Sequence, residues 1–380
     1  MRTQVGIVGA GPAGLLLSHL LALQGIDSVV LEARSREYVE KRVRAGVLEH
    51  PTVELLREVG LGERMDREGL PHEGVSLRFA GEQHRIDFAD LTGRGIVVYG
   101  QQEVVKDLIA RRLADGGDVR FDVSGVVLDG LTDDPVIRFD GGELRCDVIV
   151  GADGFHGVSR AAVPHAAYDR QYPFAWLGIL AKAAPTHHEL VYANHVNGFA
   201  LYSMRSPEVT RLYLQVPPDT DADSWSEAQV WDELHVRLGT EINEGPLIEK
   251  SVTGMRSFVS EPMRHGKLFL AGDAAHIVPP TGAKGMNLAI ADVRVLAEAL
   301  CSHLRDGDDA GIDAYSDTCL RRVWRAEHFS WWMTSMLHTD PDADGFDRRL
   351  QLSQLRQTVS SRAAATTFAE NYVGLPHGSV

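Results

Sequence analysis

Residues 4–14, QVGIVGAGPAG, indicate the fold of this chain. Gln4–Val8 is typical of a buried strand, and Leu15–Leu23 is an apolar run typical of a helix. The turn between them contains Gly9, Gly11 and Gly14. Strand, glycine turn and helix in this order suit a dinucleotide pyrophosphate, which the N–H groups at the helix N-terminus would face.

An acidic residue stands where such a nucleotide site needs one. A second predicted strand, Ser28–Leu31, ends in Glu32. The Glu32 carboxylate can accept hydrogen bonds from the ribose of an adenosine. A tight turn without a ligand is the alternative, but strand, helix and acid together favour the nucleotide.

The segment 266–292, GKLFLAGDAAHIVPPTGAKGMNLAIAD, holds a second set of signals. Gly266–Leu270 predicts a buried strand with Asp273 beyond its carboxyl end. Pro279–Pro280 forbids helix, and a helix is expected after Gly282–Gly285. Asp273 would hold a ribityl hydroxyl of a flavin. The glycines would let the backbone approach a flavin ring or a phosphate closely. Standing alone, an Asp beside a turn is also typical of a cap.

Composition excludes several classes of protein. The 380 residues are enough for two packed domains. No apolar run approaches the roughly 20 residues of a membrane span and no secretion leader is seen, so we expect a cytoplasmic protein. A net charge of −15 opposes binding to nucleic acid or an anionic membrane, so an anionic substrate would need local arginines. Cys146, Cys301 and Cys319 match no metal or disulfide pattern, and no metal is expected.

The periodicity predicts an α/β fold with a helical end. We expect a Rossmann-like nucleotide domain from residues 1–71, 100–171 and 266–304, and a mixed or antiparallel β-sheet domain from residues 72–99 and 172–265. Residues 305–380 would form a helical C-terminal region. A ligand crevice is expected where the two domains meet. The other predicted strands are Val75–Phe79, His84–Phe88, Asp118–Val127, Pro135–Phe139, 144–154, Phe174–Lys182, His188–Ala193, Phe199–Arg205 and Arg211–Val216, with helices at Glu103–Leu113 and Ser226–Leu238.

The chain has a single Gly-x-Gly-x-x-Gly pattern. A nicotinamide cofactor would therefore have no Rossmann domain of its own to hold it permanently. If a pyridine nucleotide reduces a flavin here, it must visit an exposed groove and leave.

Beside the glycine turn, seven segments carry a resemblance to a known family. They are 42–47 (RVRAGV), 153–156 (DGFH), 192–195 (YANH), 258–262, 279–287, 329–334 (FSWWMT) and 370–376 (ENYVGLP). Together they make the chain resemble the single-component, FAD-dependent aromatic hydroxylases over essentially its whole length. The flavin motifs are shared by a broad superfamily and indicate the cofactor, whereas the tyrosine, serine and arginine set of the middle sheet is narrower and indicates the substrate.

The resemblance implies how FAD is held. Residues 42–47 resemble a flavin-contacting loop that would let the ring swing outward to the reductant and inward to the substrate. Arg44 and Gln102 would hold the phosphates and the ribityl chain. On the residues alone, Arg42 and Arg44 are as typical of a solvated face. The implied FAD residues are Gly9, Gly11, Ala13, Gly14, Glu32, Arg42, Arg44, Ala45, Gly46, Val47, Gln102, Asp273, Met286 and Asn287.

The resemblance also implies a pocket for an aromatic carboxylate. Arg205 offers a fork of donors to the carboxylate oxygens, with Ser203 on the same strand face and Tyr213 on the next strand. At the other end of the ring, Tyr192 and the Pro280 carbonyl would contact a phenolic oxygen.

A proton relay completes the implied catalytic set. Electrophilic attack needs an electron-rich ring, so the phenol should lose its proton before oxygen transfer. Tyr192, Tyr372 and His72 match the family's relay that carries this proton to solvent. A half-buried Tyr with a satisfied hydroxyl, or a surface His, is the alternative for each.

For the reductant, His156 and Arg256 match family residues that contact NADPH, and Tyr38 is retained in a second region. This chain departs from the family there, because Ala33 follows the glutamate where better-known members have arginine. Arg34 or Arg36 would compensate. We therefore expect NADPH as the reductant with NADH tolerated.

The implied reaction converts 4-hydroxybenzoate to 3,4-dihydroxybenzoate with NAD(P)H and O2, through a flavin C4a-hydroperoxide. One alternative is a hydroxylase of another substituted benzoate such as 4-aminobenzoate. Another is a flavin reductase or dehydrogenase without oxygen insertion, and a third is a flavin-binding protein with no activity, which would have no use for a proton relay. The resemblance also implies a homodimer.

Overall fold

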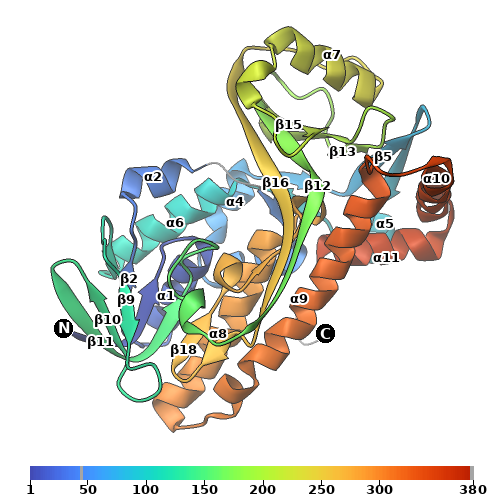
Figure 1. Ribbon diagram of the computed structural model, residues 1–380. Coiled ribbons are helices and arrows are strands. Elements are labelled where there is room, and N and C mark those ends of the chain that lie inside the picture. The colour runs from blue at the N-terminus through green and yellow to red at the C-terminus, as the bar shows by residue number, and fades with distance from the viewer. Residues whose placement is uncertain (43–45, 377–380) are drawn as a thin grey trace.

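The computed structural model describes residues 1–42 and 46–376 and contains two eight-stranded sheets (Figure 1). The first sheet runs in the order β17-β18-β11-β1-β2-β8, and β10 and β9 extend it beside β11. The pairs of β1 with β2 and β11, of β2 with β8 and of β11 with β18 are parallel. Its strands are β1 (Arg2–Val8), β2 (Ser28–Leu31), β8 (Asp118–Arg120), β9 (Val127–Asp129), β10 (Val136–Phe139), β11 (Gly142–Gly151), β17 (Arg264–His265) and β18 (Leu268–Leu270).

Helices cover this sheet because parallel strands need crossover connections. Helix α1 (Pro12–Leu23) follows β1 directly and packs against α6 (Gln101–Ala114) and α8 (Gly285–Asp306). The leucines of α1 are buried from Leu15 to Leu17 and at Leu21, so this helix lies in the core of the domain. The shorter helices nearby are α2 (Arg36–Lys41), α3 (His50–Glu58) and α4 (Gly62–Glu68).

The second sheet runs in the order β19-β16-β12-β15-β14-β13-β5-β6. All its pairs are antiparallel except β13 with β5. Strands β12 and β16 are long and cross between the two halves of the molecule (Figure 1). The strands are β5 (Gly74–Phe79), β6 (Glu82–Asp87), β12 (Ala166–Ala181), β13 (Val191–Ala193), β14 (Ala200–Ser206), β15 (Val209–Val216), β16 (Leu247–Glu261) and β19 (His276–Ile277).

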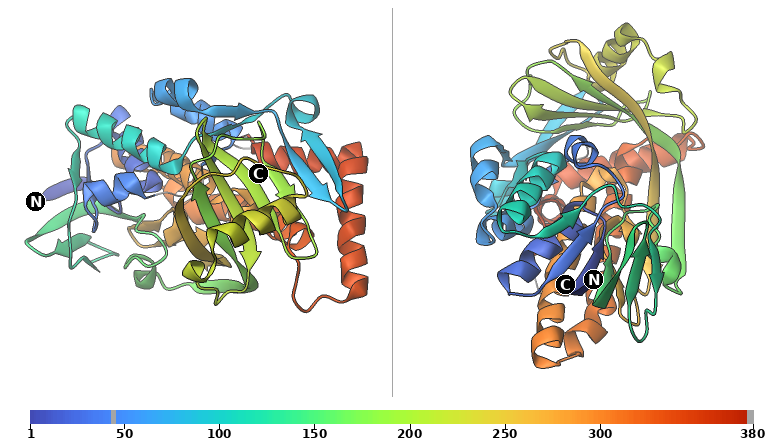
Figure 2. Two further views of the ribbon diagram at one scale, coloured as in Figure 1. Left: turned by 90° about the horizontal axis from the view of Figure 1, so that it is seen from above. Right: turned by 90° about the vertical axis from the view of Figure 1, so that its left-hand side faces the viewer.

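The two faces of the second sheet pack against different helices. One face meets α7 (Glu227–Leu238), and the other meets α9 (Ala310–Leu337) and α11 (Arg362–Val373). Figures 1 and 2 show the C-terminal helices on the side of the molecule opposite the N-terminus. The other α-helices and strands of the described residues are α5 (Phe88–Thr92), α10 (Gly345–Ser360) and a small sheet of β3 (Val47–Leu48), β7 (Ile96–Val98) and β4 (Leu70–His72).

The predicted fold class is confirmed, with corrections at particular elements. Asp118–Val127 is not one strand, because Asp122 and Gly125 have φ of 58° and 67° and break it between β8 and β9. Gly266 has φ of 56° and turns the chain from β17 into β18, so the strand predicted from Gly266 begins two residues later. No helix of the described residues is long and apolar enough to cross a membrane.

The largest difference concerns β12 and β16. Strand β12 begins at Ala166, well before the predicted Phe174, and β16 is a strand that the sequence pattern does not single out. The first part of β12 is largely exposed and is held by its hydrogen bonds to β16, so no buried face marks it in the sequence. The domain division remains a proposal, and its boundary at residues 171 and 172 lies inside β12.

The carboxyl group of Glu327 is buried where α9 meets β16. Glu327 of α9 has Oε1 enclosed and without a hydrogen-bond partner among the described residues. Burial raises the pKa of Glu327 to about 7, against opposing effects of Ser257 and His276. His276 itself contacts Asp292 at 2.6 Å, and this contact raises the pKa of His276 although burial opposes it.

We predict that Glu327→Gln makes stability less dependent on pH. With a folded-state pKa of about 7 against an ordinary 4.5, the contribution of Glu327 is fully present below pH 4.5 and is lost as pH rises through 7. The glutamine should therefore raise the free energy of unfolding at pH 8 by up to about 3 kcal/mol, with little effect at pH 4.5. Urea unfolding at both pH values measures this, and an unchanged pH dependence in the variant would contradict it.

Candidate functional site

Four strand ends of the first sheet meet at one edge. Strands β2, β1, β11 and β18 are consecutive neighbours and parallel, so their carboxyl ends lie together. The residues that follow these ends include Glu32, Gly9, Asp153 and Asp273. Such an edge is where ligands bind in sheets of this type.

Glycine suits the three turn positions for different physical reasons. Gly9 has φ of 107°, and a Cβ there would lie 2.2 Å from the Ala152 carbonyl oxygen. A Cβ on Gly14 would lie 2.0 Å from the Gly9 oxygen, so both glycines are needed to close the turn. Gly11, in contrast, has nothing within 4 Å of its Cβ position. The backbone at Gly11 is therefore open to a ligand at the N-terminus of α1.

Glu32 is held beside this turn by backbone groups. Its Oε2 accepts a hydrogen bond from Ala10 N at 2.7 Å, and its Oε1 accepts one from Arg34 N at 2.8 Å. Each carboxylate oxygen has a second lone pair, which a ribose hydroxyl can use. Ala13, in the first turn of α1, is buried close to the Cβ position of Gly272.

The polar atoms around this edge fit a flavin dinucleotide. Gln102 Oε1, at the start of α6, and Asp153 Oδ1 are buried without partners among the described residues. Burial raises the pKa of Asp153, although Ser159 donates two hydrogen bonds to its other oxygen. Asp273 is exposed at the end of β18. Buried orphan acceptors, an open glycine and a helix N-terminus are what the hydroxyls and phosphates of FAD require.

The flavin loop predicted at residues 42–47 is described in part. Arg44 and Ala45 lie outside the described residues. Arg42 is exposed after α2, whereas Gly46 lies against Gly100, whose Cα would be 2.7 Å from a Cβ on Gly46. Val47 opens β3 and is buried.

Asn287 ties this loop to the start of α8. Its side chain donates to the carbonyls of Val47 and Ala283, each at 3.0 Å, and accepts from Glu49 N and Thr52 Oγ1. These bonds use the side-chain amide fully, so it positions the loop. A cofactor contact by Met286 or Asn287 would therefore use first-turn backbone N–H groups of α8, which have no partner within the helix.

The second sheet places two predicted tyrosines on one face. Tyr192 pairs with Leu201, Leu201 with Tyr213, and Tyr213 with Gly178. We call this the tyrosine row (Gly178, Tyr213, Leu201 and Tyr192). Tyr192 and Tyr213 are two strands apart, roughly 10 Å at the backbone, which leaves room for one aromatic ring between groups reaching from either side.

The predicted carboxylate group lies at the Tyr213 end of the row. Ser203 is buried on β14, and the side chain of Arg205 hydrogen-bonds Tyr213. Arg205 lies in a bulge between Met204 and Ser206. A bulge interrupts the regular alternation of side chains between the two faces of a sheet, so it changes the direction of the Arg205 side chain. Burial lowers the pKa of Arg205, so an anion beside it would restore favourable electrostatics.

Sequence reasoning missed Arg211 in this group. Arg211 is buried, pairs with Ser203 across the sheet and stacks over the Tyr213 ring at 5.2 Å. Its Nε and Nη1 atoms have no hydrogen-bond partner among the described residues. The available signal was its spacing two residues before Tyr213, which puts both on one face of β15.

The predicted relay is partly assembled. The hydroxyls of Tyr192 and Tyr372 lie 2.5 Å apart, and both tyrosines are buried. Burial lowers the pKa of His72, on β4, to about 4, and neither ring nitrogen has a partner among the described residues. The Pro280 carbonyl accepts from Ala283 N at 3.0 Å and retains a second lone pair.

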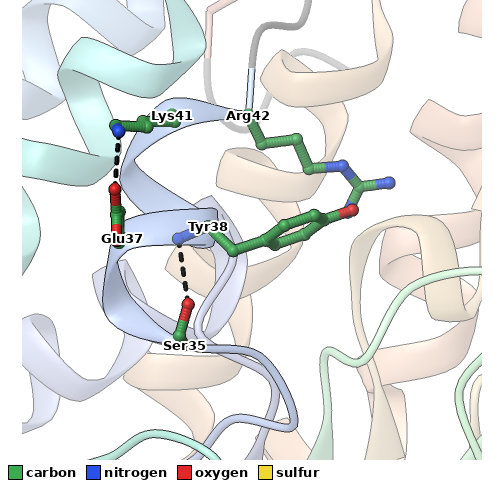
Figure 3. Close-up of a pocket in the computed structure, with 5 residues that line it drawn as sticks. All are labelled: Ser35, Glu37, Tyr38, Lys41 and Arg42. Atoms are coloured by element: carbon green, nitrogen blue, oxygen red, sulfur yellow. Dashed lines mark hydrogen bonds and ion pairs between the residues drawn. The ribbon is translucent and has the colours of Figure 1, made fainter.

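The predicted reductant residues lie at two surface sites. Tyr38 and Arg42 help to line a surface pocket and point toward one another (Figure 3). Arg34 stacks over the Tyr38 ring at 5.4 Å. At the second site His156 is exposed, and Arg256 binds Asp169 through two hydrogen bonds while stacking over Phe155 at 4.4 Å. The pocket residues are Ser35, Glu37, Tyr38, Lys41 and Arg42.

We predict that alanine weakens FAD binding at Gly11 and lowers stability at Gly9. Gly11→Ala should leave the unfolding free energy of the apoprotein within about 1 kcal/mol, because its backbone is extended and its Cβ position open. Its FAD dissociation constant should rise at least about tenfold, because the methyl group takes the phosphate's space. Gly9→Ala should cost about 2 kcal/mol or more through strain and the Ala152 contact. Urea unfolding of the apoproteins and titration with FAD measure both effects. An unaltered FAD affinity in Gly11→Ala would contradict the placement of a phosphate at Gly11.

Comparisons with known proteins agree with this geometry. The model of a family described as FAD binding domain matches residues 2–330. The chain is 47% identical to p-hydroxybenzoate hydroxylase of Acinetobacter baylyi, over 99% of this chain and 96% of that protein. It is 30% identical to 6-methylpretetramide 4-monooxygenase of Streptomyces rimosus, over 81% and 77% of the two chains. The fold matches p-nitrophenol 4-monooxygenase of Pseudomonas putida with a TM-score of 0.82, 20% identity and 99% of both chains covered. The chain therefore belongs to the FAD-binding domain family.

Proposed function

We propose that this chain hydroxylates 4-hydroxybenzoate at the 3-position. In the balanced reaction, 4-hydroxybenzoate, NAD(P)H, O2 and a proton give 3,4-dihydroxybenzoate, NAD(P)+ and water. The observation that carries the proposal is the tyrosine row, with Arg205 and Arg211 at one end and the Tyr192–Tyr372 pair at the other. The high identity to a protein named p-hydroxybenzoate hydroxylase supports it.

The arginine end binds the carboxylate. Arg205 and Arg211 are like charges on one buried surface, and the charge of Arg211 adds to burial in lowering the pKa of Arg205. A benzoate carboxylate brings the opposite charge and accepts several donors at once. Ser203 and the Tyr213 hydroxyl add directional contacts, so substrates without a carboxylate should bind weakly.

The tyrosine end removes the phenolic proton. Burial holds the pKa of both Tyr192 and Tyr372 above the ordinary value, so they remain protonated and pass a proton by exchanging hydrogen bonds. His72 is neutral at pH 7 because its pKa is low, and its two ring nitrogens have no partner among the described residues, so they can take part in the relay. Bound FAD supplies the hydride acceptance and the oxygen chemistry, while the chain supplies orientation and a dry pocket.

We propose NADPH as the preferred reductant, with NADH tolerated. Arg34 and Arg42 form no ion pair with other described residues, so both are available to a phosphate beside Tyr38. Lys41 in the same pocket is already paired with Glu37 at 2.6 Å (Figure 3). Ala33 adds no charge. Arg256 would have to share its guanidinium with Asp169 to reach a second phosphate.

The test is NADPH oxidation, and separately NADH oxidation, by the FAD-loaded protein with and without 4-hydroxybenzoate. We expect strong stimulation by the benzoate, with 3,4-dihydroxybenzoate matching the cofactor consumed and NADPH used faster than NADH. Stimulation with peroxide and little product would indicate another benzoate, for which 4-aminobenzoate is the first to assay. Oxidation that does not require O2 would indicate a reductase.

Tyr192→Phe separates binding from chemistry in the same assay. The benzoate should still bind through Arg205, but product per NAD(P)H should fall at least about tenfold as peroxide replaces it, because the phenol keeps its proton. Tyr202→Phe is the matched control, since Tyr202 is a buried tyrosine on the other face of β14 whose hydroxyl accepts from Thr186 N. Equal product yields from the two variants would refute the relay.

We also propose a homodimer. Tyr168, Trp324 and Trp331 are 49%, 41% and 40% exposed. The Tyr168 and Trp324 rings touch, with centroids 5.3 Å apart, and Trp331 follows Trp324 by two turns on the same face of α9. Grouped surface aromatics are typical of interfaces. Sedimentation should give twice the chain mass of 41.7 kDa, and Trp324→Arg with Trp331→Arg should give a monomer. A monomeric unmodified protein would exclude the dimer.

A further inference from the structure

A buried histidine packs on the sheet face that carries the tyrosine row, beside Trp176. His338 follows the last residue of α9 and is buried. Its Nε2 lies 2.6 Å from Trp176 Nε1, and its Nδ1 lies 3.0 Å from the Thr334 carbonyl oxygen. An indole N–H can only donate, so Nε2 is the acceptor and Nδ1 carries the proton. Burial lowers the pKa of His338 to about 3, which keeps this neutral form at working pH.

The His338 ring is packed between aromatic side chains that lead to both ends of the tyrosine row. It stacks on Phe199 at 4.3 Å and on Phe174 at 4.7 Å. Trp176, bonded to His338, contacts the Tyr213 ring at 4.7 Å. Phe199 contacts the Tyr192 ring at 6.2 Å. A single imidazole therefore touches the supports of both tyrosines.

The chain around His338 is also tied to the two strands that carry those tyrosines. Asn194, two residues after Tyr192, donates to the Leu337 carbonyl at 3.0 Å. Gln215, two residues after Tyr213, donates to the Thr339 carbonyl at 2.6 Å and accepts from Thr339 N at 3.0 Å. The residues before and after His338 therefore join β13 to β15.

We propose that His338 is a positioning residue that sets the distance between Tyr192 and Tyr213, and hence the length of aromatic acid that the pocket accepts. This inference rests on the proposed function. The bond to Trp176 fixes the indole against Tyr213, while the imidazole face fixes Phe199 against Tyr192. Loss of this bond leaves the buried indole N–H without a partner, which favours a shift of the ring and of Tyr213 with it.

The experiment compares 4-hydroxybenzoate with 4-hydroxyphenylacetate, which is one methylene longer, as ligands of the FAD-loaded protein. His338→Phe keeps an aromatic ring but removes the acceptor, and His338→Gln keeps an acceptor and a donor. For His338→Phe, the dissociation constant of 4-hydroxyphenylacetate divided by that of 4-hydroxybenzoate should fall about three- to tenfold. The amount of product formed per NADPH should fall as well. His338→Gln should restore most of both, and FAD affinity should be unchanged in either variant.

Two further variants serve as a control and as an alternative test. His19→Phe removes another buried histidine bonded to a carbonyl, Val59 O at 2.9 Å, and should lower stability without changing the ligand ratio. If His338→Phe does not fold, Trp176→Phe breaks the same bond from the other side and should shift the ratio in the same direction. An unaltered ratio and coupling in His338→Phe and Trp176→Phe would overturn the inference. Failure of the unmodified protein to hydroxylate 4-hydroxybenzoate would instead overturn the proposed function, and the inference with it.

Discussion

The long antiparallel ladder between β12 and β16 is the constraint on which both candidate sites depend. Near one end, Phe258 of β16 pairs with Ile277 of β19, a few residues beyond Asp273. Near the other, Gly178 of β12 pairs with Tyr213 in the tyrosine row. The pairing of β12 with β16 is interrupted between Gln171 and Ala175 but continues on both sides, so the two strands run together from one site to the other. It therefore fixes the flavin edge of the first sheet relative to the substrate pocket of the second.

Buried charge distinguishes the two ends of the proposed pocket. At one end Arg205 and Arg211 place positive charge inside a chain whose net charge is −15, and a locally bound anion would offset that charge. At the other end the buried groups are neutral, because Tyr192 and Tyr372 keep their protons and His72 lacks one at neutral pH. A substrate with a carboxylate at one end and a weakly acidic hydroxyl at the other matches this polarity.

Neutral buried groups also hold the pocket walls. His338 accepts from Trp176 and donates to the end of α9, and Asn287 uses all of its amide to join β3 to α8. Such fully bonded groups have one favourable arrangement, since any displacement leaves a buried donor or acceptor without a partner. The same argument sets Gln102 and Asp153 apart, because each has a buried oxygen without a partner among the described residues. Asp153 follows β11 at the edge that fits FAD, and Gln102 lies at the start of α6 beside Gly100.

The sequence by itself determined the features that depend on neighbouring residues. The glycine turn, the first βαβ unit, Glu32 and the strands of Arg205 and Tyr213 follow from local spacing, because turn conformation and strand alternation act over a few residues. The tertiary structure decided the rest. Tyr192 meets Tyr372 180 positions away, and Trp176 meets His338 162 positions away. The start of β12 is held by its partner strand, without a buried face of its own. No periodicity encodes contacts of this range, because they arise only when the sheet and the helices pack.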